Sequence, residues 1–526
     1  MLSLNVINAP RSSYFQLQSG FAVLLTVFCL NLACCGADWP QYRGPTHDGV
    51  STDRINKQWT GSVTNALWRV FLGNGITSFA VSGGLALTQV HRDVNGADTE
   101  VCVALNTSDG TEAWATPVDD IVSYWGGGVG STDDGPRSTP TLDNGSVYVM
   151  SSYLKLLRLN AINGSVVWSN NLMVTYGSGE IPWQNAASLL VENGLIFLNA
   201  NAPTSSLMAL RTTDGSLAWR TQDEVLSHST PVLTTIDGVH QVVFATKSNL
   251  VSLNPTTGGL LWKVQYPFRV GDTLAVSPVI HSNIVFISGY YTAASFATRV
   301  SLSNSTWVTT PLWTNSSLRS WWSTPVAYQG HLFGQFNPDN QYTALRCIEL
   351  ATGAEKWVEY FFGRGSVLLV DDHLLAITET GFLVLATPNT NAYTEVARLL
   401  AIPDYHSDTN KCWNAPAVCD GKVYVRSTAY AAAFDLSVPE TPYLKLDPPW
   451  LSPGKLLGLT IRTTNGTPIG SNRLTGMEVK TSADPAMPLA LWTKLTNSLS
   501  LTNGIVSVTN VDASAPRRFF IVSEPK

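Results

Sequence analysis

The chain has 526 residues, of which 44% are hydrophobic and 13% charged, and it contains 40 Gly, 28 Pro and 17 Trp. This composition is typical of a large, β-rich, turn-rich protein and argues against a disordered or a mainly helical one. The formal net charge of −6 provides no basic surface, so nucleic acid and anionic membrane surfaces are not expected partners.

The first elements in the chain predict export. Residues 21–33 (FAVLLTVFCLNLA) are apolar, are preceded by Arg11 as the only charge, and lead into small residues before Asp38. This pattern is typical of a signal peptide, here over residues 1–37, and the run is shorter than the ~20 residues that span a bilayer. We predict a periplasmic or extracellular protein without a transmembrane segment in the mature chain. Lipid attachment at Cys34 or Cys35 is an alternative that the preceding residues fit less well.

A repeat begins after an N-terminal extension at residues 38–65. Each unit has a β-prone strand, a polar turn with Gly and a Trp, as in residues 250–262, and most units start with Ser/Thr-Pro, as at Ser138-Thr139-Pro140. Successive units carry their Trp 43 to 54 residues apart, at positions 68, 114, 168, 219, 262, 313 and 357. Each unit supplies four strands, which is one blade of a β-propeller.

Eight inner strands are expected, beginning near Ile76, Arg137, Gln184, Ser229, Ala275, Trp322, Gly365 and Trp413. The eighth set ends at residues 434–436 without an outer strand, and residues 66–70 can supply it. We therefore predict an all-β fold with an eight-bladed propeller over residues 66–438, closed by an N-terminal strand. A right-handed solenoid is the alternative, but complementary ends favour a ring. The Trp residues should dock each blade on its neighbour.

The last part of the chain changes in composition. Residues 439–456 contain a Pro-rich stretch and are expected to be a linker, while residues 457–526 hold short β-prone runs that predict a small β-sandwich-like module. Four Cys remain after the predicted signal peptide, which permits three pairings. They are expected to be either disulfide-bonded or buried thiols, and Cys412 and Cys419, which six residues including Pro416 separate, form the leading disulfide candidate.

Several segments resemble a known family. Residues 345–357 (LRCIELATGAEKW) and 250–262 resemble the pyrroloquinoline-quinone-like (PQQ-like) repeat, and the resemblance extends over about residues 66–436. Residues 38–45 (DWPQYRGP) with Asp48-Gly49-Val50-Ser51 resemble the opening of secreted planctomycete and verrucomicrobial propellers of this family. Residues 492–495 and 517–520 resemble C-terminal modules of secreted bacterial proteins. The repeat is also similar to that of the bacterial outer-membrane assembly propeller, which engages protein partners.

The resemblance raises the question of a cofactor. Quinoprotein dehydrogenases with this repeat hold the quinone with a disulfide between adjacent Cys, a Ca²⁺ ion, an Asp base and an aromatic floor. The only adjacent pair here, Cys34-Cys35, lies in the predicted signal peptide, so PQQ with Ca²⁺ is a disfavoured alternative and no cofactor is assigned. The Gly-rich loop at residues 123–135 carries Asp133 and Asp134 but lacks the ligand pattern of a Ca²⁺ loop, so we expect a surface insertion and no metal site.

The candidate site is where the inner strands begin, because those residues line the channel. Eight residues of functional type occupy such positions and are expected to converge on one rim: Arg137, Trp183, Gln184, His228, Trp321, Trp322, Trp413 and Asn414. Such a set suits a sugar ring, a planar cofactor or a peptide. The structural alternative is that they plug the ring or cap strands.

Three functions follow from these features. The leading hypothesis is a ligand-binding or protein-interaction scaffold in the cell envelope, whose partner is an envelope protein, a glycan or a small molecule. The first alternative is a quinone-dependent oxidoreductase or another rim-centred enzyme acting on a carbohydrate or an alcohol. The second is a polysaccharide-binding protein. No catalytic residue is assigned from the sequence.

Overall fold

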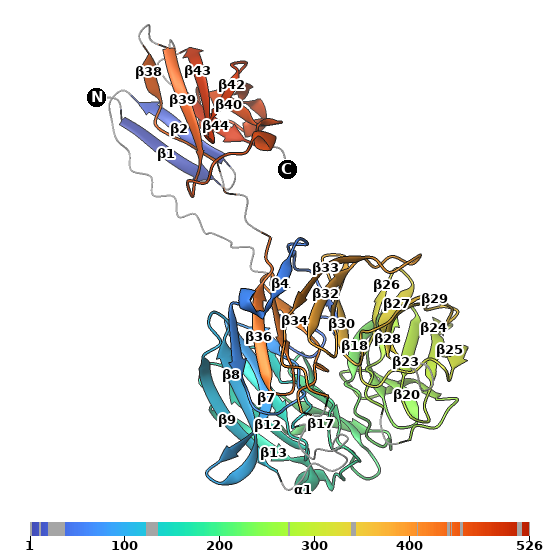
Figure 1. The fold of residues 1–526 in the computed structure, drawn as a ribbon. Helices are drawn as coiled ribbons and strands as arrows, with labels where there is room; N and C mark the ends of the chain where they lie inside the picture. Colours follow the sequence, from blue (N-terminus) through green and yellow to red (C-terminus); the bar gives the residue numbers. More distant parts are fainter. Residues whose placement is uncertain are drawn as a thin grey trace. The chain divides into compact units, whose positions relative to one another are not determined.

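The computed structural model describes residues 3–9, 12–18, 37–121, 135–271, 274–337, 343–407, 409–438, 442, 444–452, 456–512 and 518–524. The chain forms two compact units, one over Cys35–Val438 and one made of Met1–Cys34 with Pro439–Lys526 (Figure 1). Within the described residues no helix has the length and apolar character needed to cross a membrane. Most of the predicted Gly-rich insertion and the apolar run at 21–33 lie outside those residues.

Four antiparallel sheets form the first half of the larger unit, each with its strands in sequence order. Blade 1 has β6 (Ala80–Ser82), β7 (Leu85–Val94), β8 (Ala97–Asn106) and β9 (Glu112–Asp120). Blade 2 has β10 (Thr141–Asp143), β11 (Ser146–Met150), β12 (Lys155–Asn160) and β13 (Val166–Asn171), followed by α1 (Leu172–Tyr176). Blade 3 has β14 (Leu190–Glu192), β15 (Leu195–Asn199), β16 (Leu207–Arg211) and β17 (Leu217–Thr221). Blade 4 has β18 (Val232–Ile236), β19 (Val239–Ala245), β20 (Asn249–Leu253) and β21 (Leu260–Gln265).

Four further sheets complete the ring. Blade 5 has β22 (Val279–His281), β23 (Ile284–Ser288), β24 (Ser295–Ser303) and β25 (Thr306–Asn315). Blade 6 has β26 (Val326–Tyr328), β27 (His331–Phe336), β28 (Ala344–Glu349) and β29 (Glu355–Glu359). Blade 7 has β30 (Ser366–Val370), β31 (His373–Ile377), β32 (Phe382–Ala386) and β33 (Glu395–Leu400). Blade 8 has β34 (Ala417–Cys419), β35 (Lys422–Arg426), β36 (Tyr430–Asp435) and the early strand β5 (Trp68–Phe71).

The ring closes as the sequence predicts. β5 pairs antiparallel with β36, from Tyr430 opposite Phe71 to Ala433 opposite Trp68, so the two ends of the propeller segment share one blade. The eight-bladed all-β prediction is thereby confirmed. Blade 7 also gains two short strands from the N-terminal extension, β3 (Val50–Ser51) on its inner edge and β4 (Thr60–Ser62) on its outer edge, and η1 (Val63–Asn65) follows β4.

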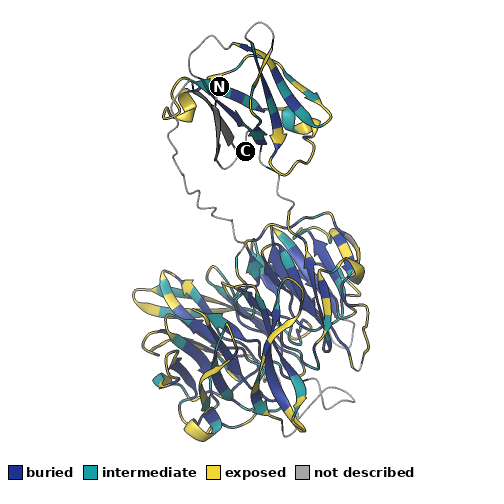
Figure 2. Cartoon of the chain, turned by 90° about the vertical axis from the view of Figure 1, so that its left-hand side faces the viewer, coloured by how far each residue is buried: buried dark blue, intermediate teal, exposed yellow. Residues whose placement is uncertain are grey.

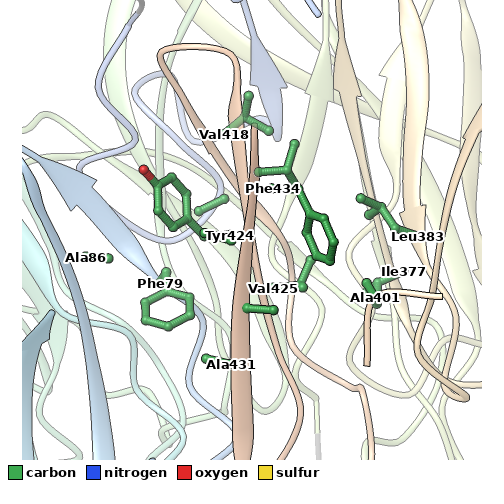
Figure 3. Close-up of a cluster of buried hydrophobic side chains, with 14 of the residues drawn as sticks. Phe79, Ala86, Ile377, Leu383, Ala401, Val418, Tyr424, Val425, Ala431 and Phe434 are labelled. Carbon is green, nitrogen blue, oxygen red and sulfur yellow. The ribbon is translucent and has the colours of Figure 1, made fainter. Parts of the chain in front are cut away.

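The seam between blades 7, 8 and 1 is filled by one apolar cluster (Figure 3). Phe79 of blade 1 packs edge-on against Tyr424 of blade 8 with ring centroids 6.4 Å apart, while Leu383 and Ile377 of blade 7 lie beyond Phe434. The second strand of each blade is largely buried, as in β11 and β31, whereas turns and outer strands such as β13 and β25 carry exposed residues (Figure 2). The core is therefore the set of blade-to-blade contacts, which repeat around the ring.

A Trp clasp joins most neighbouring blades. Trp114 of β9 donates from Nε1 to Ala161 O of blade 2 at 3.0 Å and lies against Gly164, where an added Cβ would come within 2.5 Å of the indole. Trp68, Trp168, Trp219 and Trp313 repeat this contact on Gly110, Gly215, Gly258 and Gly353. Trp262 instead bonds Gln241, because the turn of blade 5 at Asn304-Ser305 has no glycine. The predicted docking role is confirmed.

The N-terminal extension runs along the inner side of the ring. Trp39 pairs with Val81 on the innermost strand of blade 1, and Pro40 O accepts from Leu142 N of blade 2. The Arg43 guanidinium then donates to Thr324 O and Pro325 O of blade 6 at 2.8 and 2.9 Å. The segment therefore crosses the channel from blades 1 and 2 to blades 6 and 7, and this gives the DWPQYRGP motif a structural role.

The smaller unit has two packed sheets. One sheet contains β37 (Leu444–Leu446), β38 (Trp450–Ser452), β39 (Leu456–Thr463), β42 (Leu499–Thr502) and β43 (Ile505–Asp512). The other sheet contains β1 (Ser3–Ala9), β2 (Ser12–Gln18), β40 (Glu478–Ser482), β41 (Thr493–Lys494) and β44 (Phe519–Ser523). Two short helices, η2 (Ser471–Leu474) and η3 (Leu489–Leu491), connect strands. Two findings go beyond the sequence prediction: β37 and β38 lie within the expected linker, and β2 of the predicted signal segment pairs with β44.

The disulfide expected between Cys412 and Cys419 is not formed, and both residues are buried free thiols. The reason is local geometry. Cys412 donates from its backbone N to Glu379 O of blade 7, after which the chain continues past Pro416 into β34, where Cys419 is the last residue. The residues between them contain a bend at Asn414 but no hydrogen-bonded turn that brings the two side chains together.

Candidate functional site

A Ser or Thr stands at or just before the start of the innermost strand in seven of the eight blades, four of them followed by Pro, and blade 8 has Ala415 there. We call this set the hydroxyl girdle: Ser78, Thr139, Ser188, Thr230, Ser277, Thr324 and Ser366. The backbone N–H of one member donates to the hydroxyl oxygen of the next blade, as from Ser78 to Thr139 at 3.1 Å, Thr139 to Ser188 at 2.9 Å and Ser188 to Thr230 at 2.9 Å. The motif therefore staples adjacent blades at the channel.

A pocket of about 470 Å³ lies above this girdle, at the mouth of the channel, and receives side chains from all eight blades. Each blade contributes residues from just before its innermost strand, and Tyr42 of the N-terminal extension lines the pocket as well. Because inner strands run in the same direction in every blade, their starts meet at one end of the ring. The convergence of strand starts that the sequence predicts is therefore present.

One side of the pocket is aromatic. Trp322 and Trp413 have ring centroids 4.4 Å apart and planes inclined at 45°, and Trp321 lies 5.6 Å from Trp322. We call these three residues the aromatic corner. Trp321 is held from behind by Tyr290, with centroids 3.4 Å apart in a stacked arrangement. The two tilted indoles form an open angle with no parallel slot between them.

Arg364 fixes the aromatic corner electrostatically. Its guanidinium carbon lies 5.0 Å from the Trp413 ring centroid and 5.8 Å from that of Trp322, which are cation–π distances. Glu379, which does not line the pocket, accepts from Arg364 Nε at 3.1 Å and from Trp413 Nε1 at 2.9 Å. A carboxylate outside the pocket thus sets the positions of two side chains within it. Lys411 Nζ lies 4.4 Å from the Trp413 ring centroid.

The opposite side of the pocket is polar. His228 Nε2 lies 2.9 Å from Pro182 O, which can only accept, so Nε2 carries the proton. Burial and the Arg137 guanidinium lower the pKa of His228 to about 4, so the ring is neutral at neutral pH. Arg137 Nη1 donates to Trp183 O at 3.2 Å. Trp183 and Gln184 both have left-handed backbone, with φ of 70° and 52°, which bends this loop over the pocket.

Seven of the eight sequence-derived candidates line this pocket: Arg137, Trp183, His228, Trp321, Trp322, Trp413 and Asn414. Gln184 does not line it and is buried. Sequence reasoning missed Tyr42, Tyr291, Arg364 and Lys411. Arg364 directly precedes the inner strand of blade 7, so the positional signal that selected Arg137 could have found it. Tyr42, Tyr291 and Lys411 lie in irregular segments that carry no such register.

The pocket does not fit a calcium-bound quinone. Such a site needs a carboxylate for the cation and adjacent Cys beside the cofactor, and the described residues that line the pocket include neither Asp, Glu nor Cys. Among the residues that the structure describes, no three His, Cys, Asp or Glu side chains are grouped as metal ligands. Cys102 and Cys347 are buried within blades 1 and 6. We derive no redox step for this site.

The fold and the channel pocket define a PQQ-like β-propeller. The family model described as "Outer membrane protein assembly factor BamB" matches residues 61–178 and 97–359, which together span more than half of the chain, and the chain belongs to this family. No curated protein sequence matches it.

Solved structures with a similar fold include BamB from Moraxella catarrhalis, at 12% identity and a TM-score of 0.47, covering 69% of this chain and 95% of that one. A second is the quinohemoprotein alcohol dehydrogenase ADHIIG of Pseudomonas putida HK5, at 12% identity and a TM-score of 0.49, covering 80% of this chain and 84% of that one. A third is the quinohemoprotein alcohol dehydrogenase of Comamonas testosteroni, at 12% identity and a TM-score of 0.48, covering 79% of this chain and 82% of that one.

Proposed function

We propose that this chain is an exported, non-catalytic propeller of the cell envelope that binds a small molecule in the channel pocket. The observation that carries the proposal is the convergence of aromatic, cationic and amide side chains from different blades on one cavity of about 470 Å³. That volume lies within the ~300–1,000 Å³ of small-molecule sites, which are mostly apolar with a few fixed polar groups. Export is supported by the apolar run at residues 21–33.

A protein partner is the second candidate, and a separate feature favours it. Phe361 is 91% exposed with a left-handed φ of 68°, and the neighbouring Tyr360 is 45% exposed, both in the loop that leads to Arg364. Exposed aromatic residues beside a pocket are typical of interaction surfaces. The family description, which names an outer-membrane assembly factor, agrees with an envelope protein as partner. The oxidoreductase alternative has no such support, because the quinone ligands are missing.

The test uses the purified full chain and a panel of hexoses, hexuronates, aromatic carboxylates and PQQ, each with and without Ca²⁺. Thermal shift and calorimetry should find at least one compound that binds saturably. Trp322→Ala removes a wall of the pocket and should lower that affinity at least tenfold, since burying an indole contributes several kcal/mol. Phe361→Ala, the matched control outside the pocket, should bind normally. If no compound binds, or if Trp322→Ala binds as well as wild type, the small-molecule proposal is wrong.

A further inference from the structure

The two sides of the pocket differ in chemistry, and the ring places them face to face. Blades 2 to 4 contribute Arg137 and His228, with Thr139, Ser188 and Thr230 of the hydroxyl girdle. Blades 6 and 8 contribute the aromatic corner. In an eight-bladed ring blade 3 stands opposite blade 7, so the polar side faces the aromatic side across the cavity. Trp183 also lines the first side, and Arg364, Lys411 and Asn414 also line the second, so the two sides differ in the balance of polar and aromatic groups. A ligand that fills the pocket is expected to present its more apolar face to the aromatic corner.

The hydroxyl girdle supplies donors to the pocket. The oxygens of Thr139, Ser188 and Thr230 each accept a backbone N–H of the preceding blade. A hydroxyl has a single hydrogen, which must then point away from that N–H. Around the polar side, three neighbouring hydroxyl groups thus offer hydrogen atoms near the channel axis. Their complement is an oxygen-rich acceptor such as a carboxylate.

The charges that line the pocket point to the same kind of group. Arg137, Arg364 and Lys411 are the charged side chains among the described lining residues, and all three are basic. Glu379 neutralises Arg364 from outside the cavity. Basic side chains and hydroxyl donors around one cavity favour an anionic ligand group over a cationic one.

The shape of the aromatic corner and the buried polar atoms of the lining residues favour a sugar ring over a flat aromatic ring as the ligand. The aromatic corner is open at 45°, which suits the C–H face of a puckered ring better than a flat ring that needs a parallel slot. Unpartnered buried atoms of both kinds belong to lining residues: among the described residues the donors Trp321 Nε1 and Trp322 Nε1 have no partner, and neither do the acceptors His228 Nδ1 and Asn414 Oδ1. A sugar hydroxyl can accept from the two indoles and donate to the two acceptors, whereas an aromatic carboxylate or a quinone brings mainly acceptors.

We infer that the ligand is a sugar acid, a pyranose with a carboxylate, whose ring packs on Trp322 and Trp413 and whose carboxylate faces Arg137 and the hydroxyl girdle. This inference rests on the proposed function, because it specifies the chemical class of the molecule in the same pocket. The neutral form of His228, whose pKa burial lowers to about 4, keeps Nδ1 an acceptor at neutral pH.

The experiment compares three probes by calorimetry on the full chain: methyl β-D-glucuronoside, methyl β-D-glucoside and 2-naphthoate. We expect the glucuronoside to bind at least about tenfold more tightly than the glucoside, as a hydrogen bond to a charged group allows. Arg137→Gln should lower the glucuronoside affinity about tenfold and so remove this preference, with a smaller effect on the glucoside. Its matched control is Arg158→Gln in the same blade, where Arg158 bonds Ser146 outside the pocket.

A second pair of variants tests the neutral acceptor. His228→Phe should weaken both sugars about fivefold and 2-naphthoate less, while the exposed His240→Phe in the same blade should change none of the three affinities. If 2-naphthoate or PQQ binds more tightly than the glucuronoside, in a way that Trp322→Ala abolishes, the sugar-acid inference is wrong and the proposed function stands. If no member of the wider panel binds, the proposed function fails with it.

Discussion

The protonation state of a single residue in this propeller, His228, cannot be predicted from the residues next to it in the sequence. His228 is followed by a Ser-Thr-Pro start and could have been a metal ligand, an acid–base group or a core residue. The structure makes it a buried neutral imidazole between Pro182 O and the Arg137 guanidinium. Its position in the pocket was predictable from the strand start, whereas its protonation state depends on burial and on a neighbour 91 residues earlier, which no local pattern reveals.

The buried imidazole predicts a pH-dependent stability. The pKa of His228 falls from 6.5 to about 4 on folding, so between these values the unfolded chain binds a proton that the folded chain does not. The free energy of unfolding should therefore rise with pH between about 4 and 6.5 and level off above pH 6.5. Acidification through this window should lower it by on the order of 3 kcal/mol because of this residue. Urea unfolding of wild type and His228→Gln between pH 4.5 and 7.5 measures it. Equal pH slopes in the two proteins would contradict a neutral buried ring.

At the scale of the blade, the sequence is highly informative where contacts repeat. The Gly and Trp of the repeat predict the clasp because each blade makes the same contact with the next, and the Ser/Thr-Pro start recurs because each staples the channel. Sequence-based prediction fails for segments whose contacts occur at only one place in the chain, because no other repeat shows the same pattern. The N-terminal extension crosses the channel by irregular backbone, and β37 and β38 are too short to stand out from a linker. The expected pairing of Cys412 with Cys419 is absent, because Cys412 is held against Glu379 of blade 7.

The clasp predicts a graded response to two glycine substitutions in blade 2. Gly164 and Gly145 both have left-handed φ, of 71° and 73°, so Ala costs each about 1 kcal/mol in backbone strain. A Cβ at Gly164 would also overlap the Trp114 indole at 2.5 Å, while at Gly145 it meets nothing within 4 Å. Gly164→Ala should therefore lose a further ~1–3 kcal/mol, measured by urea unfolding. Equal losses would mean that the indole moves away without cost.

At the scale of the whole molecule, the ring must close between its last and first blades. Besides β5 and the aromatic contacts already described, a buried arginine spans this seam. Arg426 of blade 8 is buried and donates to Gly75 O at 2.7 Å, Gln89 O at 3.1 Å and Thr77 Oγ1 at 3.1 Å of the blade 1 segment. Burial lowers its pKa to about 9, so it stays protonated at neutral pH. The repeat pattern does not predict this arginine, because the last residue of the second strand is a different type in other blades, such as Met150 in blade 2 and Ile377 in blade 7.

Arg426→Met is expected to open the seam. The substitution keeps the apolar stem but leaves Gly75 O buried without its Arg426 donor, which costs about 1–3 kcal/mol, while Gln89 O loses one of two donors and keeps Thr77 Oγ1. The total loss should therefore reach at least ~2 kcal/mol. Lys422→Met, at the opposite end of the same strand, is the control. Hydrogen exchange should accelerate first in β5 and β36 and not in blades 3 to 5, because a ring opened at one joint frays from that joint. Uniform acceleration around the ring would instead mean that the propeller unfolds as one unit whichever joint is weakened.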